Sequence, residues 1–258
     1  MLKRWEELPD FMRVPEVRPY YDILAKKQVH LMVKRLFDIV MAVVILVILA
    51  LPMIMIAIAI KLDSKGTVLY RQERITTYGR SFKIHKFRTM VDNADRIGSA
   101  ITANDDNRVT RIGKILRRMR MDEFPQVFDV LSGNMSFVGT RPEVPKYVKQ
   151  YTPEMRATLL VPAGITSEAS VRYREESKLL SLSADIDQIY LEQILPAKMF
   201  WNLKSIRDFR LAQDAHTLAR TILAVLGKNY DNAVKKDTSI KEKVRIDEGW
   251  TPDSFNDQ

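Results

Sequence analysis

The sequence contains no cysteine, which excludes disulfide bonds and thiolate metal sites. Its three histidines, His30, His85 and His216, are far apart and show no metal-ligand spacing. Any bound metal would therefore be held by carboxylates, which favour magnesium or manganese over zinc. The sequence also has no Walker loop, no GxGxxG motif and no GxSxG motif, so it carries no signature of a P-loop enzyme, a dinucleotide-binding enzyme or an α/β-hydrolase.

Positive charge is concentrated in one block. The 258 residues carry a net charge of +9, and residues 61–120 alone hold 15 Lys/Arg against 6 Asp/Glu, so the rest of the chain is balanced. A solvated basic face and a nucleic-acid patch are two interpretations of such a block. Because this one directly follows an apolar segment, we expect it to contact anionic lipid headgroups or phosphorylated substrates, and no nucleic acid.

The apolar segment runs from Ile39 to Ile60 and contains no charged residue. As a helix its 22 residues would extend ~33 Å, enough to cross a hydrocarbon core of ~30 Å. It starts too far from the N-terminus for a removable signal peptide and has no small-residue cleavage site. A buried core helix fits this length and purity poorly. We therefore predict a membrane helix over residues 31–61.

Two features of this segment predict that it enters and leaves the membrane on the same face. Pro52 removes a backbone hydrogen bond and bends the helix. Basic residues flank the segment on both sides: Lys26, Lys27, Lys34 and Arg35 before it, and Lys61, Lys65, Arg71 and Arg74 after it. Since the positive-inside rule keeps both flanks in the cytoplasm, a re-entrant helix satisfies it and a single crossing does not. Proline kinks also occur in spanning helices, so the single crossing stays open at this point.

The predicted fold class is α+β and mainly helical, with a re-entrant membrane helix hairpin and a cytoplasmic domain that contains a short β-hairpin and amphipathic interfacial helices. The hairpin strands are expected at residues 68–71 and 82–87, and an amphipathic helix at residues 111–121. A helix-rich region follows over residues 185–226. Four units are predicted: an irregular or surface-lying arm (1–30), the membrane helix (31–61), the cytoplasmic domain (62–227) and a mobile tail (228–258).

A candidate site lies at Asp122 and Glu123, which follow an arginine-rich helix. Asp122 is suited to cap a new helix, whose N-terminus would keep it ionised and favour nearby phosphates. The simpler alternative is that Asp122 is only a cap and Glu123 only a solvated carboxylate. The segment Gly133–Pro142 adds two glycines and Arg141, which can present backbone amides and a guanidinium to a phosphate.

Several ordered motifs extend this pattern over about residues 31 to 170. They are Lys34-Arg-x-Phe-Asp38, the apolar segment with its central Pro52, Lys61-Leu-Asp-Ser, Gln72-Glu-Arg, Phe82-x-Ile-x-Lys-Phe-Arg-Thr-Met90, Asp122-Glu-x-x-Gln126 and Met135-Ser-Phe-Val-Gly-x-Arg-Pro142. Together they resemble the bacterial sugar transferases. More narrowly, they resemble the monotopic polyprenyl-phosphate phosphoglycosyl transferases, which start glycoconjugate assembly.

The resemblance implies a two-step transfer of a phosphosugar from a UDP-sugar to polyprenyl (undecaprenyl) phosphate. Asp122 would form a covalent phosphosugar intermediate with release of UMP, and Glu123 would hold Mg2+. The substrate phosphates would be bound by Arg117, Arg141, Lys86 and Arg88. Lys34, Arg35, Asp38 and Pro52 would belong to the membrane re-entry, and Asp187 would be a further polar site residue. The implied location is the bacterial inner membrane, with the catalytic domain on the cytoplasmic face.

The chain departs from the usual family pattern at several positions. Thr140 replaces a proline before Arg141, Asn134 replaces an aspartate, and Leu51 replaces the small residue before Pro52. The stretch 162–171 differs most, so the sugar donor cannot be inferred. The rival hypothesis is a non-enzymatic, single-pass anchored protein that binds membrane lipids or partners through its basic block, and a homo-oligomer stays open under both.

Overall fold

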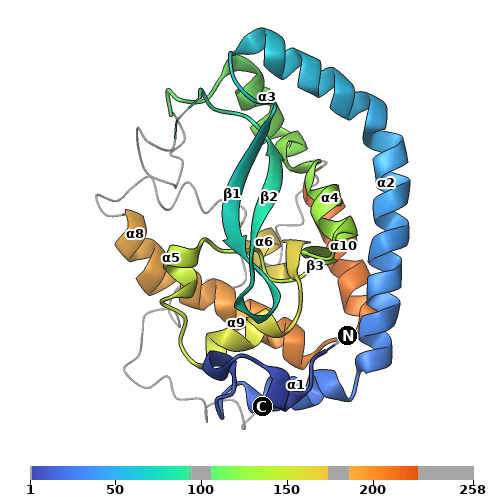
Figure 1. The fold of residues 1–258 in the computed structure, drawn as a ribbon, viewed down its shortest axis with the longest axis vertical. Coiled ribbons are helices and arrows are strands. Elements are labelled where there is room, and N and C mark those ends of the chain that lie inside the picture. Colours follow the sequence, from blue (N-terminus) through green and yellow to red (C-terminus); the bar gives the residue numbers. More distant parts are fainter. Residues whose placement is uncertain (1, 93, 95–105, 174–185, 226–258) are drawn as a thin grey trace.

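The computed structural model of the protein describes residues 2–92, 94, 106–173 and 186–225. These residues form a mainly helical body with two small two-stranded sheets and one long apolar helix near the N-terminus (Figure 1). The mainly helical α+β class is therefore confirmed. The predicted C-terminal tail, residues 228–258, lies outside the described residues.

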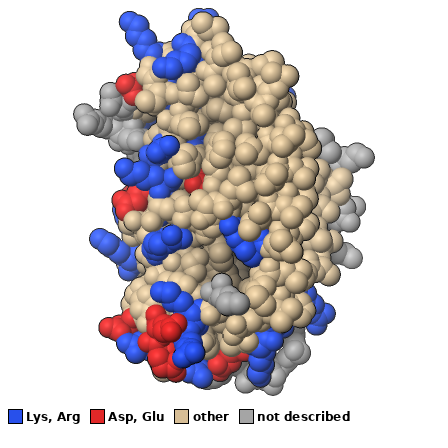
Figure 2. Space-filling model, turned by 45° about the vertical axis from the view of Figure 1, so that its right-hand side comes forward, with Lys and Arg blue, Asp and Glu red and all other residues tan. Residues whose placement is uncertain are grey.

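The long helix is α2, Gln28–Asp63, which contains Pro52 and curves along one side of the molecule (Figure 1). By length and composition it could cross a membrane. Only 11% of its most apolar 18-residue stretch is buried inside the protein. Its exposed large apolar side chains are Val29, Met32, Val33, Leu36, Phe37, Ile39, Val40, Val43, Val44, Val47, Ile48, Leu51, Ile54, Met55, Ile58 and Leu62. On the α2 side of the molecule, Figure 2 shows a broad band without charged side chains, with Lys and Arg along its borders. A continuous apolar surface of this kind is typical of contact with lipid or another protein.

The first part of α2 is attached to the body by polar contacts. Lys34 Nζ pairs with Asp214 Oδ2 at 2.5 Å. The guanidinium of Arg35 donates to the carbonyls of Val130 and Leu131 at 2.7 and 3.0 Å. These carbonyls belong to the end of α4, Gln126–Leu131, so Arg35 supplies donors where a helix leaves its carbonyls unpaired.

Asp38 and the last turn of α2 contact the same body. The carboxylate of Asp38, 2% exposed, accepts from the Phe137 backbone amide at 3.2 Å. At the other end, Asp63 Oδ2 accepts from the Ile112 amide at 3.2 Å, and Ile56 and Ile60 are buried in a small apolar cluster. Both ends of the apolar segment are thus bound to one polar domain.

The predicted hairpin is confirmed. Strand β1, Leu69–Ile75, pairs antiparallel with β2, Ser81–Phe87, and η3, Thr77–Gly79, forms the turn. Tyr78 and Gly79 both have positive φ (59° and 75°), which lets the chain reverse between the strands. Phe82 and Ile84 are buried in a cluster with residues of α4 and α2.

The predicted amphipathic helix at the end of the basic block is α3, Arg111–Arg118. Its cap is Thr110, whose Oγ1 accepts from the Gly113 amide at 3.0 Å. Gly113 leaves no room for a side chain, because a Cβ would lie 2.0 Å from the Thr89 carbonyl oxygen. The chain then turns through Arg120 (φ 58°) into a short 3-10 helix, η5, Met121–Glu123, before α4.

The expectation that Asp122 caps a helix is wrong. Asp122 lies inside η5, and the N-cap of α4 is Pro125, which has no side-chain cap bond. The amides at the start of α4 donate instead to carbonyls of the preceding turn, Val127 to Phe124 at 3.2 Å and Phe128 to Pro125 at 3.1 Å, so the chain does not need an aspartate cap there.

The second sheet pairs β3, Met135–Val138, in parallel with β4, Ala163–Thr166. The two chains approach closely at Gly139 and Gly164, since a Cβ on Gly164 would lie 2.2 Å from the Gly139 amide nitrogen. Two short helices lie between these strands in the chain, α5, Pro145–Val148, and η6, Glu154–Leu160, and α6, Glu168–Arg172, follows β4. The sheet itself contacts α4 and α2.

The predicted helix-rich C-terminal region is confirmed within the described residues. It comprises α8, Ile186–Ile189, a π-helical segment η7, Tyr190–Ile194, α9, Leu195–Arg207, and α10, Leu211–Val225. The N-terminal segment packs against it through η1, Trp5–Glu7, η2, Asp10–Met12, and α1, Arg18–Ala25. Residues expected in a surface-lying arm thus help to form the largest core, where Met12 and Val17 are fully buried. Prolines divide the segment into short turns, which hid its apolar spacing in the sequence.

Candidate active site

Asp122 and Glu123 lie on η5, between α3 and α4 and beside β2. The left-handed backbone of Arg120 turns the chain here. The carboxylates of Asp122 and Glu123 can therefore both face inward, although they are neighbours in the sequence. The Oδ1 atom of Asp122 is buried and has no hydrogen-bond partner among the described residues. A buried, unpaired carboxylate oxygen is costly, which makes it a candidate for chemistry or ligand binding.

Glu123 is surrounded by cations. Its Oε1 atom accepts from Arg141 Nη2 at 2.6 Å and from Lys86 Nζ at 3.2 Å, and Arg120 Nη1 lies 3.8 Å away. The side chain is only 11% exposed. Glu123 therefore holds together charges from β2, η5 and the loop after β3, which is more than the solvated carboxylate of the simpler alternative.

The two carboxylates have opposite pKa shifts. Burial raises the pKa of Asp122 above its ordinary value of 3.8, although the charge of Lys86 opposes this. Burial also acts to raise the pKa of Glu123, but Arg141 and Lys86 outweigh it and lower that pKa far below 4.5. Adjacent carboxylates with diverging pKa values are typical of a division of roles in catalysis.

The predicted phosphate-binding residues are only partly brought together. Lys86 and Arg141 contact Glu123, and Arg117, whose Nε donates to Thr89 Oγ1 at 2.8 Å, is near enough to lower the pKa of Asp122. Arg88 is instead 5% exposed, with its Nη2 donating to the Ser64 carbonyl at 2.7 Å and hydroxyl at 2.9 Å. It holds the end of α2, and its phosphate-binding role remains a prediction.

The glycine-rich stretch before Arg141 does not offer its glycine amides to a ligand. Gly133 donates to the Val130 carbonyl and Gly139 to the Thr166 carbonyl, at 3.1 and 2.9 Å. The expectation that these amides bind phosphate is therefore wrong, and only Arg141 of this stretch reaches Glu123. Close strand pairing explains Gly139 better than phosphate binding does.

The family model described as bacterial sugar transferase matches residues 29–228, which include α2, the hairpin, Asp122, Glu123 and the described C-terminal helices. The chain belongs to the bacterial sugar transferase family. The resemblance based on the motifs is therefore confirmed.

Relatives of this sugar transferase include a UDP-N-acetylgalactosamine-undecaprenyl-phosphate N-acetylgalactosaminephosphotransferase of Aeromonas hydrophila, 33% identical over 79% of the chain and 46% of the relative. A UDP-glucose:undecaprenyl-phosphate glucose-1-phosphate transferase of Escherichia coli is 36% identical over 77% of the chain and 43% of the relative. A protein of the same name from Caulobacter vibrioides is 39% identical over 60% of the chain and 62% of its own length. The chain spans about half the length of the first two relatives.

In this sugar transferase a clamp that the sequence analysis missed holds the loop with Arg141. Arg74 Nη1 donates to the Pro142 carbonyl at 3.1 Å, and the Ile75 amide donates to the Glu143 carbonyl at 3.0 Å. The buried Glu143 carboxylate accepts from Tyr190 Oη at 2.5 Å, with Lys198 Nζ 3.7 Å away. The loop is thus fixed to β1 on one side and to η7 and α9 on the other. Arg74 belongs to the Gln72-Glu-Arg motif. No sequence signal links Glu143 to Tyr190 and Lys198, which follow it by 47 and 55 positions.

A second pair fixes Lys86 in the transferase. Asp129 of α4 is fully buried and accepts from both the backbone amide and the Nδ1 of His85, at 2.9 and 2.8 Å. Because His85 precedes Lys86 on β2, this pair holds the strand in register with α4. The contacts of His85 with Asp129 are therefore structural.

Asp187 lies outside the group around Glu123. Its carboxylate accepts from Lys146 and, at 2.6 Å, from Tyr147 Oη, and its side chain is 40% exposed. These contacts join α8 to α5. Its assignment to the site stays a prediction.

Few carboxylate oxygens near Asp122 and Glu123 are available to a cation. No group of three or more His, Asp or Glu side chains gathers among the residues that the structure describes. Among the described residues, the oxygens open to a cation are those of Asp122, of which Oδ1 is buried, and the Oε2 of Glu123, whose hydrogen bonds all go to Oε1. Since Lys86, Arg117 and Arg141 would repel a bare divalent ion, these oxygens alone do not complete a magnesium site, and the binding of Mg2+ stays a prediction.

Replacing Lys86 by methionine in the transferase is expected to move the acid limb of turnover to higher pH. If Asp122 is the nucleophile that the motifs predict, it attacks only when ionised, and activity then falls as the pH falls through its pKa. The Lys86 charge lowers that pKa, and its loss should therefore raise it further. The measurement is the pH profile of residual turnover. Lys83→Met, at an exposed position on the same strand, serves as the control. An acid limb of K86M that is unchanged or shifted to lower pH would contradict the assignment of this limb to Asp122.

Proposed function

We propose that this protein transfers a phosphosugar from a UDP-sugar to polyprenyl phosphate at the cytoplasmic face of the inner membrane. The buried Asp122 oxygen without a partner, beside the cation-bound Glu123, carries the proposal. The family membership supports it, and so do the relatives named as undecaprenyl-phosphate sugar transferases.

In the first step a carboxylate oxygen of Asp122 attacks the β-phosphorus, which carries the sugar. The bond from this phosphorus to the oxygen bridging the two phosphates breaks, and that oxygen leaves with UMP. In the second step an oxygen of polyprenyl phosphate attacks the same phosphorus. The bond to Asp122 breaks, which regenerates the carboxylate and gives the polyprenyl diphosphate sugar.

The cations around the dyad make this attack possible. An anionic carboxylate approaches an anionic diphosphate, so the repulsion must be neutralised where the charge develops. Lys86 and Arg141 are already held at Glu123, and Arg117 is fixed by Thr89. Bound Mg2+, held by Glu123 and the open Asp122 oxygen, would add Lewis-acid neutralisation of the diphosphate.

We further propose that α2 is re-entrant. Its apolar middle is exposed, whereas Lys34, Arg35, Asp38 and Asp63 near its two ends all bind the same polar domain. A straight crossing would separate these ends by the ~30 Å hydrocarbon core. Pro52 inside the helix supplies the bend.

Cysteine labelling should place both ends of α2 on the cytoplasmic side. Gln28 and Thr67 are exposed and uncharged, so Gln28→Cys and Thr67→Cys keep the basic flanks and add the only thiols of the chain. With an impermeant maleimide neither should react in intact cells, and both should react after permeabilisation. Labelling of one site alone in intact cells would show a spanning helix.

Pro52→Leu tests the cause of the bend. Leucine restores the missing backbone hydrogen bond and favours a straight helix, so part of the population should expose residue 28 outside and lose activity. If P52L keeps the wild-type labelling and activity, Pro52 is not what holds the helix bent.

Nucleotide release separates the proposed enzyme from the non-enzymatic anchored protein. Purified protein in lipid should release UMP in repeated turnovers only when polyprenyl phosphate and a suitable UDP-sugar are both present. A panel of UDP-sugars identifies the donor. Failure to release UMP with any donor of the panel, while the protein stays folded and lipid-bound, would favour the anchored binding protein.

A further inference from the structure

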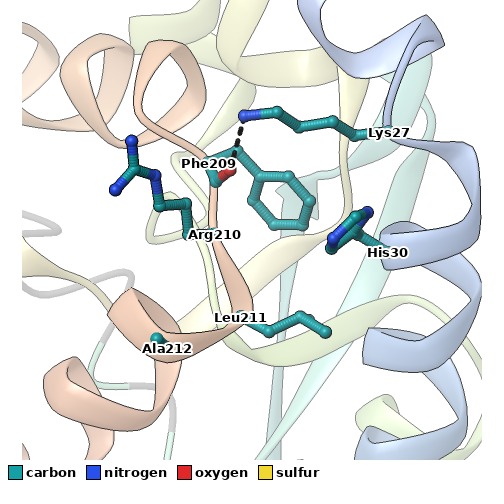
Figure 3. Close-up of a pocket in the computed structure, with 6 residues that line it drawn as sticks. All are labelled: Lys27, His30, Phe209, Arg210, Leu211 and Ala212. Atoms are coloured by element: carbon teal, nitrogen blue, oxygen red, sulfur yellow. Dashed lines mark hydrogen bonds between the residues drawn. The ribbon is translucent and has the colours of Figure 1, made fainter.

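A separate hollow of about 590 Å³ lies between the start of α2 and the connection of α9 to α10 (Figure 3). Its lining residues are Lys27, His30, Phe209, Arg210, Leu211 and Ala212. In Figure 1 the start of α2 lies near the bottom of the molecule and α3, which precedes the dyad, lies near the top. The hollow therefore belongs to a different region from the candidate active site.

The inside of the hollow is apolar. Figure 3 shows the Phe209 ring between α2 and the connection, with Leu211 extending below it toward His30. Lys27 extends over the ring, and its Nζ donates to the Phe209 carbonyl at 2.7 Å. The amine is thus turned to the backbone.

The edge of the hollow is cationic. Among the described residues, neither the His30 ring nor the Arg210 guanidinium has a hydrogen-bond or ion-pair partner. Residues 26–35 and 207–214 hold six Lys/Arg against two Asp, and Asp214 is already paired with Lys34. This edge therefore offers unpaired donors and positive charge to an anion.

The same position is where α2 begins to expose apolar side chains. Val29, Met32, Val33 and Leu36 are between 42% and 64% exposed. His30 precedes the uncharged segment by nine residues, ~14 Å along a helix. Because a headgroup layer is only about 5–7 Å thick on each side, His30 lies in this layer when the start of α2 runs obliquely to the membrane surface. An apolar hollow, a cationic edge and an apolar helix surface meet here, and this combination matches a molecule with an anionic head and hydrocarbon tails.

We propose that this hollow binds one anionic phospholipid of the surrounding bilayer. Its phosphate lies at the edge with His30 and Arg210, its glycerol backbone covers Phe209 and Leu211, and one acyl chain follows Val29 and Val33 along α2. The site holds the start of α2 at the interface. The proposal depends on α2 lying in the bilayer and not on the transfer reaction.

Native mass spectrometry of the detergent-extracted full chain tests the site, with phosphatidylglycerol and phosphatidylcholine as probes. We expect one phosphatidylglycerol to be retained in clear preference to phosphatidylcholine. A cation near an anionic lipid surface contributes about a fivefold factor in binding, so Arg210→Ala should lose about fivefold, and Arg210→Ala with His30→Ala should lose more. Arg210→Lys should retain most of the binding, whereas Lys149→Ala, an exposed cation on the soluble domain, should retain all of it.

Three outcomes would overturn the proposal. One is equal retention of the two phospholipids, and another is equal loss in the Arg210 and Lys149 variants. The third is displacement of the bound lipid by glycerol phosphate, which identifies a free-phosphate site, or by polyprenyl phosphate, which identifies part of the substrate site. His30 and Arg210 are exposed, so their variants should fold. The measurement of bound lipid does not require turnover.

Discussion

Asp122→Asn is expected to reduce turnover by at least ~1,000-fold, or about 4 kcal/mol of barrier, while leaving the protein folded. The amide keeps the shape of the side chain and cannot form the phosphosugar ester. Stability should be unchanged or higher at neutral pH, because burial raises the pKa of Asp122 and so disfavours the charge in the folded state. Steady-state UMP release and the melting temperature of the variant are the measurements.

The matched control for this variant is Asp208→Asn, at an exposed aspartate outside η5. It should have wild-type turnover and melting temperature. Near-normal turnover in D122N would reject the covalent mechanism, and lost folding in D122N would reject the argument from burial.

Glu123→Gln is expected to show the opposite pattern, with losses in both turnover and stability. Arg141 and Lys86 would keep a hydrogen-bond acceptor but lose the buried anion that binds them, at 2.6 and 3.2 Å in the wild type. Leaving buried cations without their partner costs up to about 3 kcal/mol. Turnover should fall ~100-fold or more, because the cations no longer hold their positions and a magnesium ligand is lost.

The stability loss in E123Q should depend on pH. The cations hold the pKa of Glu123 in the folded protein far below its ordinary value of 4.5. Ionised Glu123 therefore stabilises the folded protein fully above pH 4.5, and this stabilisation is lost as the pH falls toward the folded-state pKa. The melting temperatures of E123Q and wild type should therefore converge in acid. Glu73→Gln on β1 is the control and should match the wild type. Equal stability of E123Q and wild type at neutral pH would show that Glu123 does not organise the cluster.

Metal dependence can be measured on the same proteins. Chelator should inactivate the wild type and magnesium should restore it, whereas E123Q should respond weakly to both. Full wild-type activity in excess chelator would exclude a required divalent ion.

Much of the fold could be predicted because local patterns determine it. The hairpin between Leu69 and Phe87 follows from alternating side chains around Tyr78-Gly79, and α2 follows from its uncharged apolar run. The N-terminal segment could not be predicted in this way. Met12 and Val17 are buried against helices more than 140 residues later, and such pairing leaves no local periodicity.

The site shows the same limit. Asp122, Glu123 and Arg141 were identified from motifs, but the 3-10 turn around Asp122 was not, because the left-handed Arg120 that creates it has no sequence signature. Arg88 stands in the same motif as Lys86, yet it points to Ser64 at the end of α2. The clamp of Glu143 by Tyr190 and Lys198 depends on tertiary packing alone.

The most direct test of the covalent mechanism is to incubate the wild type with labelled UDP-sugar in the absence of polyprenyl phosphate. The account predicts one UMP released per active site and one phosphosugar on the peptide that contains Asp122, seen by mass spectrometry after an acid quench. Addition of polyprenyl phosphate should then remove the label from the protein and place it on the lipid. Turnover with both substrates but no UMP burst and no label on Asp122 would contradict the account and indicate direct transfer between the two substrates.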